Sequence, residues 1–124
     1  QPVLRPAARP TALGVIYFGS TSPAMQEALD VLEAEGVHLD AMRLRAFPFP
    51  EVVDQFIAAH EQVFVVEQNR DAQMHALLVN ELQVDPARLI KVLHYDGTPI
   101  TARFIAQAIQ KHLQGAQASL KEAA

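Results

Sequence analysis

The sequence predicts an α/β fold in which helices cover both faces of a mostly parallel sheet, giving three layers. Four apolar stretches of strand length are each followed by a stretch with helical spacing. Such strand–helix alternation is typical of parallel sheets with right-handed crossover connections. The 124 residues, 50% of them hydrophobic and 19% charged, suffice for one domain with its own core.

The first unit is a predicted strand over Leu13–Phe18 and a helix that begins at Pro23. Ser22 is suited to cap that helix, because its hydroxyl can accept a hydrogen bond from a free amide of the first turn. Proline is equally typical of the first helical position. The positions that would face the sheet recur at helical spacing: Met25, Ala28, Leu29 and Leu32.

Three further units follow the first. Their strands are predicted over residues 37–44, 63–66 and 89–93. The helices after these strands are predicted from apolar residues at helical spacing: Val52, Val53, Phe56 and Ile57; then Met74, Leu77 and Leu78; then Ile100, Phe104, Ile105, Ile109 and Leu113. We expect Gly97, Thr98 and Pro99 to cap the last helix and Gly115 to end it.

The composition of the strands predicts their order in the sheet. The first and third strands are continuously apolar, as central strands covered on both faces must be. The second alternates apolar and polar residues, and the fourth contains Lys91, so both are expected nearer an edge. The core order is therefore 2-1-3-4, in a sheet of four or five strands.

The two ends of the chain are predicted to lie outside the domain. Prolines at positions 2, 6 and 10 indicate that residues 1–11 are the end of a linker, and that the chain is a piece of a longer polypeptide. The domain itself is predicted over residues 12–114. Residues 115–124 are expected to form a flexible tail.

Composition excludes several classes of protein. The net charge of −4 and the lack of a Lys/Arg cluster argue against a nucleic-acid partner. No apolar run approaches the roughly 18 residues of a membrane span, so no membrane association is expected. The absence of cysteine excludes disulfides and cysteine-ligated iron–sulfur clusters within the chain, and it suits a reducing, cytoplasmic environment.

Two loops at the carboxyl edge of the predicted sheet form the candidate site. Open α/β sheets bind ligands where the strand order reverses, here between the first and third strands. Ser20, Thr21 and Ser22 offer hydroxyls at a helix N-terminus, an arrangement that suits an anion. The same residues could simply form a turn and cap the helix.

A denser polar cluster follows the third strand. The members that could bind a ligand or a neighbouring domain are Glu67, Asn69, Arg70 and Gln73. The alternative is a solvated loop in which Asp71 caps the next helix.

No catalytic or metal-binding residues are predicted. The five histidines, at positions 38, 60, 75, 94 and 112, lack the spacing of metal ligands and are expected on the surface. No phosphate-binding glycine loop and no nucleophile motif appears. We therefore expect this chain alone to bind no cofactor.

Four segments together resemble a known family. They are residues 15–24 (VIYFGSTSPA), 42–50 (MRLRAFPFP), 65–73 (VVEQNRDAQ) and 95–101 (YDGTPIT). In this order and spacing they are similar to the C-terminal domain of the α subunit of 2-oxoacid:ferredoxin oxidoreductases, most of all the 2-oxoglutarate-type enzymes. The resemblance covers about residues 12–110 and implies the transketolase C-terminal-like fold.

The resemblance implies a function for the whole enzyme. That enzyme would use thiamine diphosphate with magnesium to decarboxylate a 2-oxoacid, pass electrons through iron–sulfur clusters to ferredoxin, and transfer the acyl group to coenzyme A. Thiamine diphosphate would lie between the remainder of the α subunit and a separate β subunit. This chain would be a structural and interface domain, inactive when isolated. The alternative from the residues is an independent, flavodoxin-like module that binds a small ligand.

Overall fold

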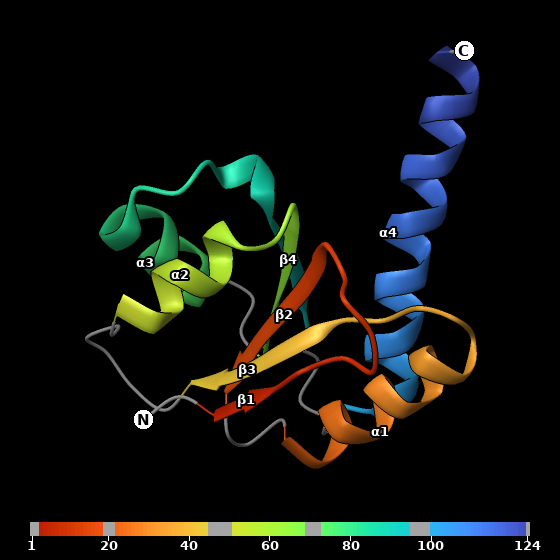
Figure 1. Ribbon diagram of the computed structural model, residues 1–124, viewed down its shortest axis with the longest axis horizontal. Coiled ribbons are helices and arrows are strands. Elements are labelled where there is room, and N and C mark those ends of the chain that lie inside the picture. Colours follow the sequence, from red (N-terminus) through yellow and green to blue (C-terminus); the bar gives the residue numbers. More distant parts are fainter. Residues whose placement is uncertain (1–2, 19–21, 45–50, 69–72, 95–99, 124) are drawn as a thin grey trace.

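The computed structural model describes residues 3–18, 22–44, 51–68, 73–94 and 100–123. A five-stranded sheet lies between two helical layers (Figure 1). The strands are β1 (Val3–Arg5), β2 (Leu13–Phe18), β3 (Asp40–Leu44), β4 (Gln62–Glu67) and β5 (Leu89–Leu93). The helices are α1 (Ser22–Ala34), α2 (Glu51–Ala58), α3 (Gln73–Leu82) and α4 (Ala102–Ala123), with a 3₁₀ turn at Pro86–Arg88.

The order of the strands is β1-β3-β2-β4-β5. Strands β3, β2, β4 and β5 run parallel to one another, which confirms the predicted core order 2-1-3-4. The fifth strand, β1, pairs antiparallel with β3 so that Leu4 lies opposite Met42. Residues 3–5, expected in a linker, thus form an edge strand, because β3 otherwise leaves its backbone groups unpaired.

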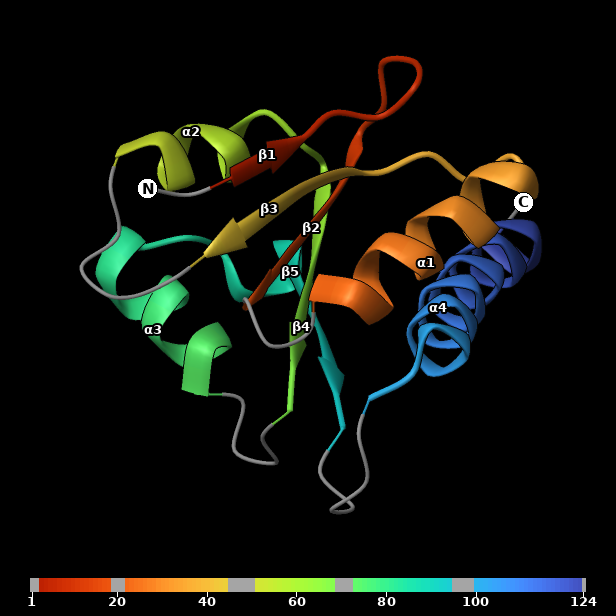
Figure 2. The ribbon, with the colours of Figure 1, turned by 90° about the horizontal axis from the view of Figure 1, so that it is seen from below.

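The two faces of the sheet are covered by different pairs of helices. In Figure 2, α1 and α4 lie on one side of the sheet and α2 and α3 on the other. Along β2, Val15 and Tyr17 pack with the α1/α4 layer, whereas Ile16 packs with the α2/α3 layer. Successive side chains point to opposite faces, so a strand covered on both sides is apolar throughout. This explains why β2 and β4 read as continuous apolar runs.

The predicted apolar faces of the helices are largely buried. In α1 they are Met25, Ala28, Leu29 and Leu32; in α2, Val53, Phe56 and Ile57; in α4, Ile105 and Ile109. Leu77 of α3 differs, because its side chain is exposed while that of Leu78 is fully buried. The short α3 therefore presents a narrower apolar stripe to the sheet than its sequence indicates.

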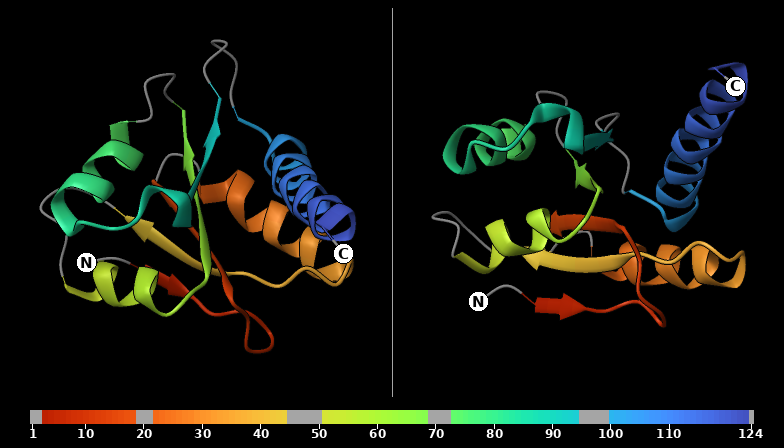
Figure 3. Two further views of the ribbon diagram at one scale, coloured as in Figure 1. Left: turned by 90° about the horizontal axis from the view of Figure 1, so that it is seen from above. Right: turned by 45° about the horizontal axis from the view of Figure 1, so that its top comes forward.

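Both ends of α4 differ from the prediction. The side chain of Thr101 caps the helix, since its Oγ1 accepts a hydrogen bond from the Phe104 amide at 3.1 Å. The residues predicted to cap it, 97–99, lie outside the described segments. At the other end the helix passes Gly115 and continues to Ala123 (Figure 3), because the residues around this glycine are mostly good helix formers.

Candidate functional site

The parallel strands of the core end at one edge of the sheet, where the candidate site was predicted. Glu67 is the last residue of β4, and Ser22 and Gln73 are the first residues of α1 and α3. Ser20, Thr21, Asn69 and Arg70 lie outside the described residues. The structure therefore places Glu67 in full, and Ser22 and Gln73 by their backbone.

Glu67 is buried, with 4% of its surface exposed. Its Oε2 accepts a hydrogen bond from the backbone amide of His75, in the first turn of α3, at 3.0 Å. Its backbone carbonyl accepts another from the His94 amide, just after β5, at 2.9 Å. A carboxylate is favourable at the positive end of a helix. Glu67 therefore links the ends of β4 and β5 to the start of α3.

Two histidines predicted on the surface are in fact buried. The Nε2 atom of His75 lies 2.8 Å from the carbonyl oxygen of Leu89, and this bond satisfies the ring inside the protein. The ring of His60 lies between two acceptors: Nδ1 is 2.6 Å from the Phe56 carbonyl oxygen, and Nε2 is 2.7 Å from Asp40 Oδ2. The spacing of histidines along a sequence indicates metal ligation only, so it carries no signal for these structural roles.

The remaining histidines, at positions 38, 94 and 112, are half-buried, and two of them make aromatic contacts. His94 meets Phe104 with ring centroids 4.9 Å apart, and His112 meets Phe64 at 5.4 Å, both edge to face. Within the described segments, no group of three or more His, Asp or Glu side chains could hold a metal ion.

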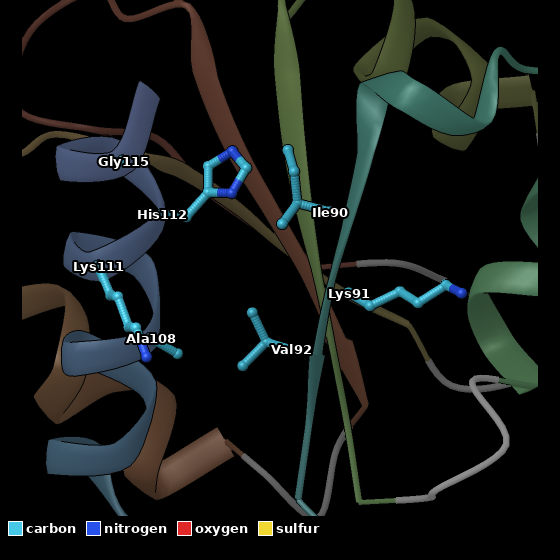
Figure 4. A pocket seen from close by; sticks show the side chains of 7 residues that line it. All are labelled: Ile90, Lys91, Val92, Ala108, Lys111, His112 and Gly115. Carbon is cyan, nitrogen blue, oxygen red and sulfur yellow. The ribbon is translucent and has the colours of Figure 1, made fainter. Parts of the chain in front are cut away.

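A groove lies away from the predicted site, between β5 and α4 (Figure 4). It has a volume of about 660 Å³ and is lined by Ile90, Lys91, Val92, Ala108, Lys111, His112 and Gly115. Ile90, Val92 and His112 point into the space between strand and helix, whereas the Lys91 side chain points to the opposite face of the sheet. The groove contains none of the residues predicted for a site.

The strand order and the two helical layers define a doubly wound α/β domain. Its candidate site is at the carboxyl edge of the sheet. No helix of the described segments is both long and apolar enough to cross a bilayer.

No family model matches the sequence. The α subunit of 2-oxoacid:ferredoxin oxidoreductase 2 from Aeropyrum pernix is 30% identical over 106 residues. The aligned region is 83% of this chain and 16% of that relative.

Solved structures of two such oxidoreductases are similar to the chain as well. The 2-oxoglutarate:ferredoxin oxidoreductase of Magnetococcus marinus, determined with 2-oxoglutarate, coenzyme A and succinyl-CoA bound, matches with a TM-score of 0.78 and 26% identity. The match covers 90% of this chain and 19% of that one. The α chain of a probable 2-oxoacid ferredoxin oxidoreductase from Thermoplasma acidophilum has a TM-score of 0.59 and 24% identity, over 91% and 97% of the two chains.

A split-gene transketolase, in an inactive β4 tetramer, shares the fold as well. Its TM-score is 0.69 at 19% identity, over 92% of this chain and 41% of the transketolase chain. The predicted three-layer, transketolase-like fold is therefore confirmed. The predicted resemblance is confirmed too: along most of its length the chain is similar to an α subunit of a 2-oxoacid:ferredoxin oxidoreductase.

Proposed function

We propose that this chain is the C-terminal, transketolase C-terminal-like domain of an α subunit of 2-oxoacid:ferredoxin oxidoreductase, in which it has a structural and interface role. The observation that supports this most directly is the 30% identity over 83% of the chain to an α subunit of which it spans only 16%. A domain of a larger subunit explains both numbers.

The substrate we propose for the whole enzyme is 2-oxoglutarate, converted to an acyl-CoA by oxidative decarboxylation. Support comes from the 26% identity and TM-score of 0.78 to an oxidoreductase determined with 2-oxoglutarate, coenzyme A and succinyl-CoA. Discrimination between 2-oxoacids would then depend on residues outside this chain.

The cofactors of such an enzyme have no fitting set of ligands among the residues that the structure describes. An iron–sulfur cluster requires cysteine ligands in the usual case, and the sequence has none. The described segments also hold no group of carboxylates or histidines for the magnesium of thiamine diphosphate. We therefore assign the clusters, magnesium and thiamine diphosphate to the other parts of the enzyme and no cofactor contact to this chain.

The proposed partners are the remainder of the α subunit and a thiamine-binding β subunit, with ferredoxin reached indirectly, all in the cytoplasm. The contact would be made by the polar loops at the carboxyl edge, through Ser20, Thr21, Ser22, Asn69, Arg70 and Gln73. Glu67 supports one of these loops from inside, since it joins the end of β4 to the first turn of α3. The comparisons do not favour an independent, flavodoxin-like ligand-binding module.

Substitutions in the loop after β4 test the interface role. We expect Arg70→Ala and Asn69→Ala to change the free energy of unfolding of this chain by no more than about ±0.5 kcal/mol, as loop substitutions usually do. In the intact enzyme the same changes should weaken association of the α and β subunits or lower the rate of 2-oxoglutarate-dependent ferredoxin reduction. An arginine supplies a planar, five-donor group suited to such contacts.

The matched control is Arg88→Ala, which removes an exposed arginine from the 3₁₀ turn before β5. It should affect neither stability nor association. A loss of several kcal/mol in the isolated chain, with assembly and activity intact, would show that Arg70 and Asn69 have an internal structural role and that the interface proposal is wrong.

A further inference from the structure

The edge strand β1 buries little apolar surface. It is three residues long and pairs only with β3, at the outer edge of the sheet (Figure 2). Val3 is 46% exposed and Leu4 is 53% exposed. Segments with few buried apolar contacts and exposed backbone hydrogen bonds open at a lower free energy than the core. Packing alone therefore does not fix β1 to the domain.

Polar contacts attach β1 to the first helical layer instead. The Arg5 guanidinium donates to Gln26 Oε1 at 2.6 Å, to the Gln26 carbonyl at 3.2 Å, and to Asp30 Oδ1 at 2.7 Å, all on α1. The Gln26 amide in turn donates to the hydroxyl of Tyr17, a buried residue of β2, at 3.0 Å. One arginine thus connects the edge strand to α1 and, through Gln26, to the central strand.

A second attachment follows directly after β1. The backbone amide of Ala7 donates to Asp40 Oδ1 at 2.7 Å. The other oxygen of Asp40 lies 2.7 Å from Nε2 of the buried His60, whose Nδ1 is bound to the Phe56 carbonyl at the end of α2. Asp40 is the first residue of β3, and His60 holds one oxygen of its carboxylate. The other oxygen is bonded to the segment that follows β1.

We propose that residues 3–7 form a latch: a segment that detaches and redocks as one unit through Arg5 and Asp40 while β2, β3, β4 and β5 stay folded. Detachment uncovers the outer edge of β3. The functional part of the inference rests on the proposed function: in a longer α subunit, the polypeptide before β1 joins the sheet at this latch. Contacts of that polypeptide then determine whether the latch is closed.

Amide hydrogen exchange of the 124-residue chain, followed by NMR, tests the latch. Of the adjacent amides of Leu4 and Arg5, one bonds to β3, and we expect that amide to exchange at least about tenfold faster than those of Val15 and Ile16 in β2. Within β3 the rates should alternate. Amides that bond to β1 should exchange at the rate of β1, and those that bond to β2 should stay protected, because adjacent backbone amides of a strand point to opposite neighbours.

The variant Arg5→Ala should increase exchange of β1 about tenfold, since it removes a partly exposed ion pair and two further hydrogen bonds. Exchange of β2 and β4 should remain unchanged, and the control Arg88→Ala should alter neither. If β1 instead exchanges together with β2, or if Arg5→Ala also raises exchange in β2 and β4, then β1 is an integral strand and the latch is wrong.

The intact α subunit tests the functional part separately. There we expect the β1 amide that bonds to β3 to become as protected as the β3 amides that bond to β2. If β1 exchanges at the same rate in the intact subunit as in this chain, the preceding polypeptide does not control the latch. Failure of the α and β subunits to associate would contradict the proposed function, and it would leave the exchange result for this chain standing.

Discussion

Gly14 in β2 is a position where the close approach of Phe56 and His60 leaves little room for a side chain. A Cβ atom built there would lie 3.0 Å from Phe56 Cε1 and 3.3 Å from His60 Cγ. Both rings are buried and packed against each other, with centroids 4.5 Å apart. We expect Gly14→Ala to lower the free energy of unfolding by about 1–3 kcal/mol, as overpacking of a core usually does. Urea denaturation measures the change.

Gly115 provides the matched control for this substitution. It lies within α4, and nothing lies within 4 Å of a Cβ atom built there. Gly115→Ala should stabilise the chain by up to about 1 kcal/mol, because alanine is the better helix former. If both substitutions raise the free energy of unfolding, Phe56 and His60 can move aside, and the close approach at Gly14 does not constrain the sequence.

At single positions, sequence reasoning predicted apolar side chains well and buried polar ones poorly. Periodicity identified Met25 and Ile109 as core residues, because burial of apolar surface repeats with the helix. His60 and Glu67 are buried because a particular carboxylate or backbone group meets each of them in the fold. Asp40 and His75, the partners of these side chains, lie in other elements of the fold, so no helical or strand periodicity indicates them. The carboxyl-edge site was placed by topology, and its loop residues remain a prediction.

The end of α3 has an unusual backbone. Gln83, directly after the helix, has a φ of +53°, in the left-handed region that side chains with a Cβ rarely adopt. This is the position at which helices commonly place glycine. We expect Gln83→Gly to leave the protein as stable or to stabilise it by up to about 1 kcal/mol, since the strain of the left-handed conformation is removed.

An exposed glutamine inside a helix is the control for Gln83. Gln107→Gly, in α4, should destabilise the protein by roughly 0.5–1 kcal/mol, because glycine loses more backbone entropy in a helix. Thermal unfolding of the two variants side by side gives the comparison. Destabilisation of similar size by both would mean that Gln83 makes contacts that outweigh its backbone strain.

The positions of whole helices and strands were predictable from the sequence where an element buries an apolar face. They were not predictable where polar contacts attach the element to the domain. Strands β2 and β4 are covered on both sides, and this burial determines both their apolar sequence and their central place. Strand β1 is too short for an alternating pattern; it pairs with β3, and polar contacts of Arg5 and Asp40 attach it to the rest of the domain. Glycine suggested an end to α4 at position 115, but one glycine costs only about 1 kcal/mol and the helix continues.

At the scale of the whole molecule, one sheet joins two apolar layers. Val15 and Phe64 contribute to the α1/α4 side, and Ile16 and Val65 to the α2/α3 side, from the same two strands. Neither layer can open without exposing one face of β2 and β4. The two sides are therefore expected to unfold together, although each has a separate set of helices.

Because of this coupling, the chain is expected to behave as one independent folding unit. We expect the 124 residues to unfold in one cooperative thermal transition, with the van't Hoff enthalpy equal to the calorimetric enthalpy. Detachment of the latch should not appear as a separate transition, because residues 3–7 bury little apolar surface. Two resolved transitions would show that the α1/α4 and α2/α3 layers are energetically separate.

The same folded chain should bind no thiamine diphosphate and catalyse no decarboxylation. Within the described segments it has no group of carboxylates or histidines that could hold the magnesium ion of that cofactor. Isothermal titration with thiamine diphosphate and magnesium should therefore give only heats of dilution, and the intact α and β subunits together serve as the positive control. Tight, stoichiometric binding by this chain would mean that its carboxyl-edge loops form a cofactor site, and a purely structural and interface role would then be wrong.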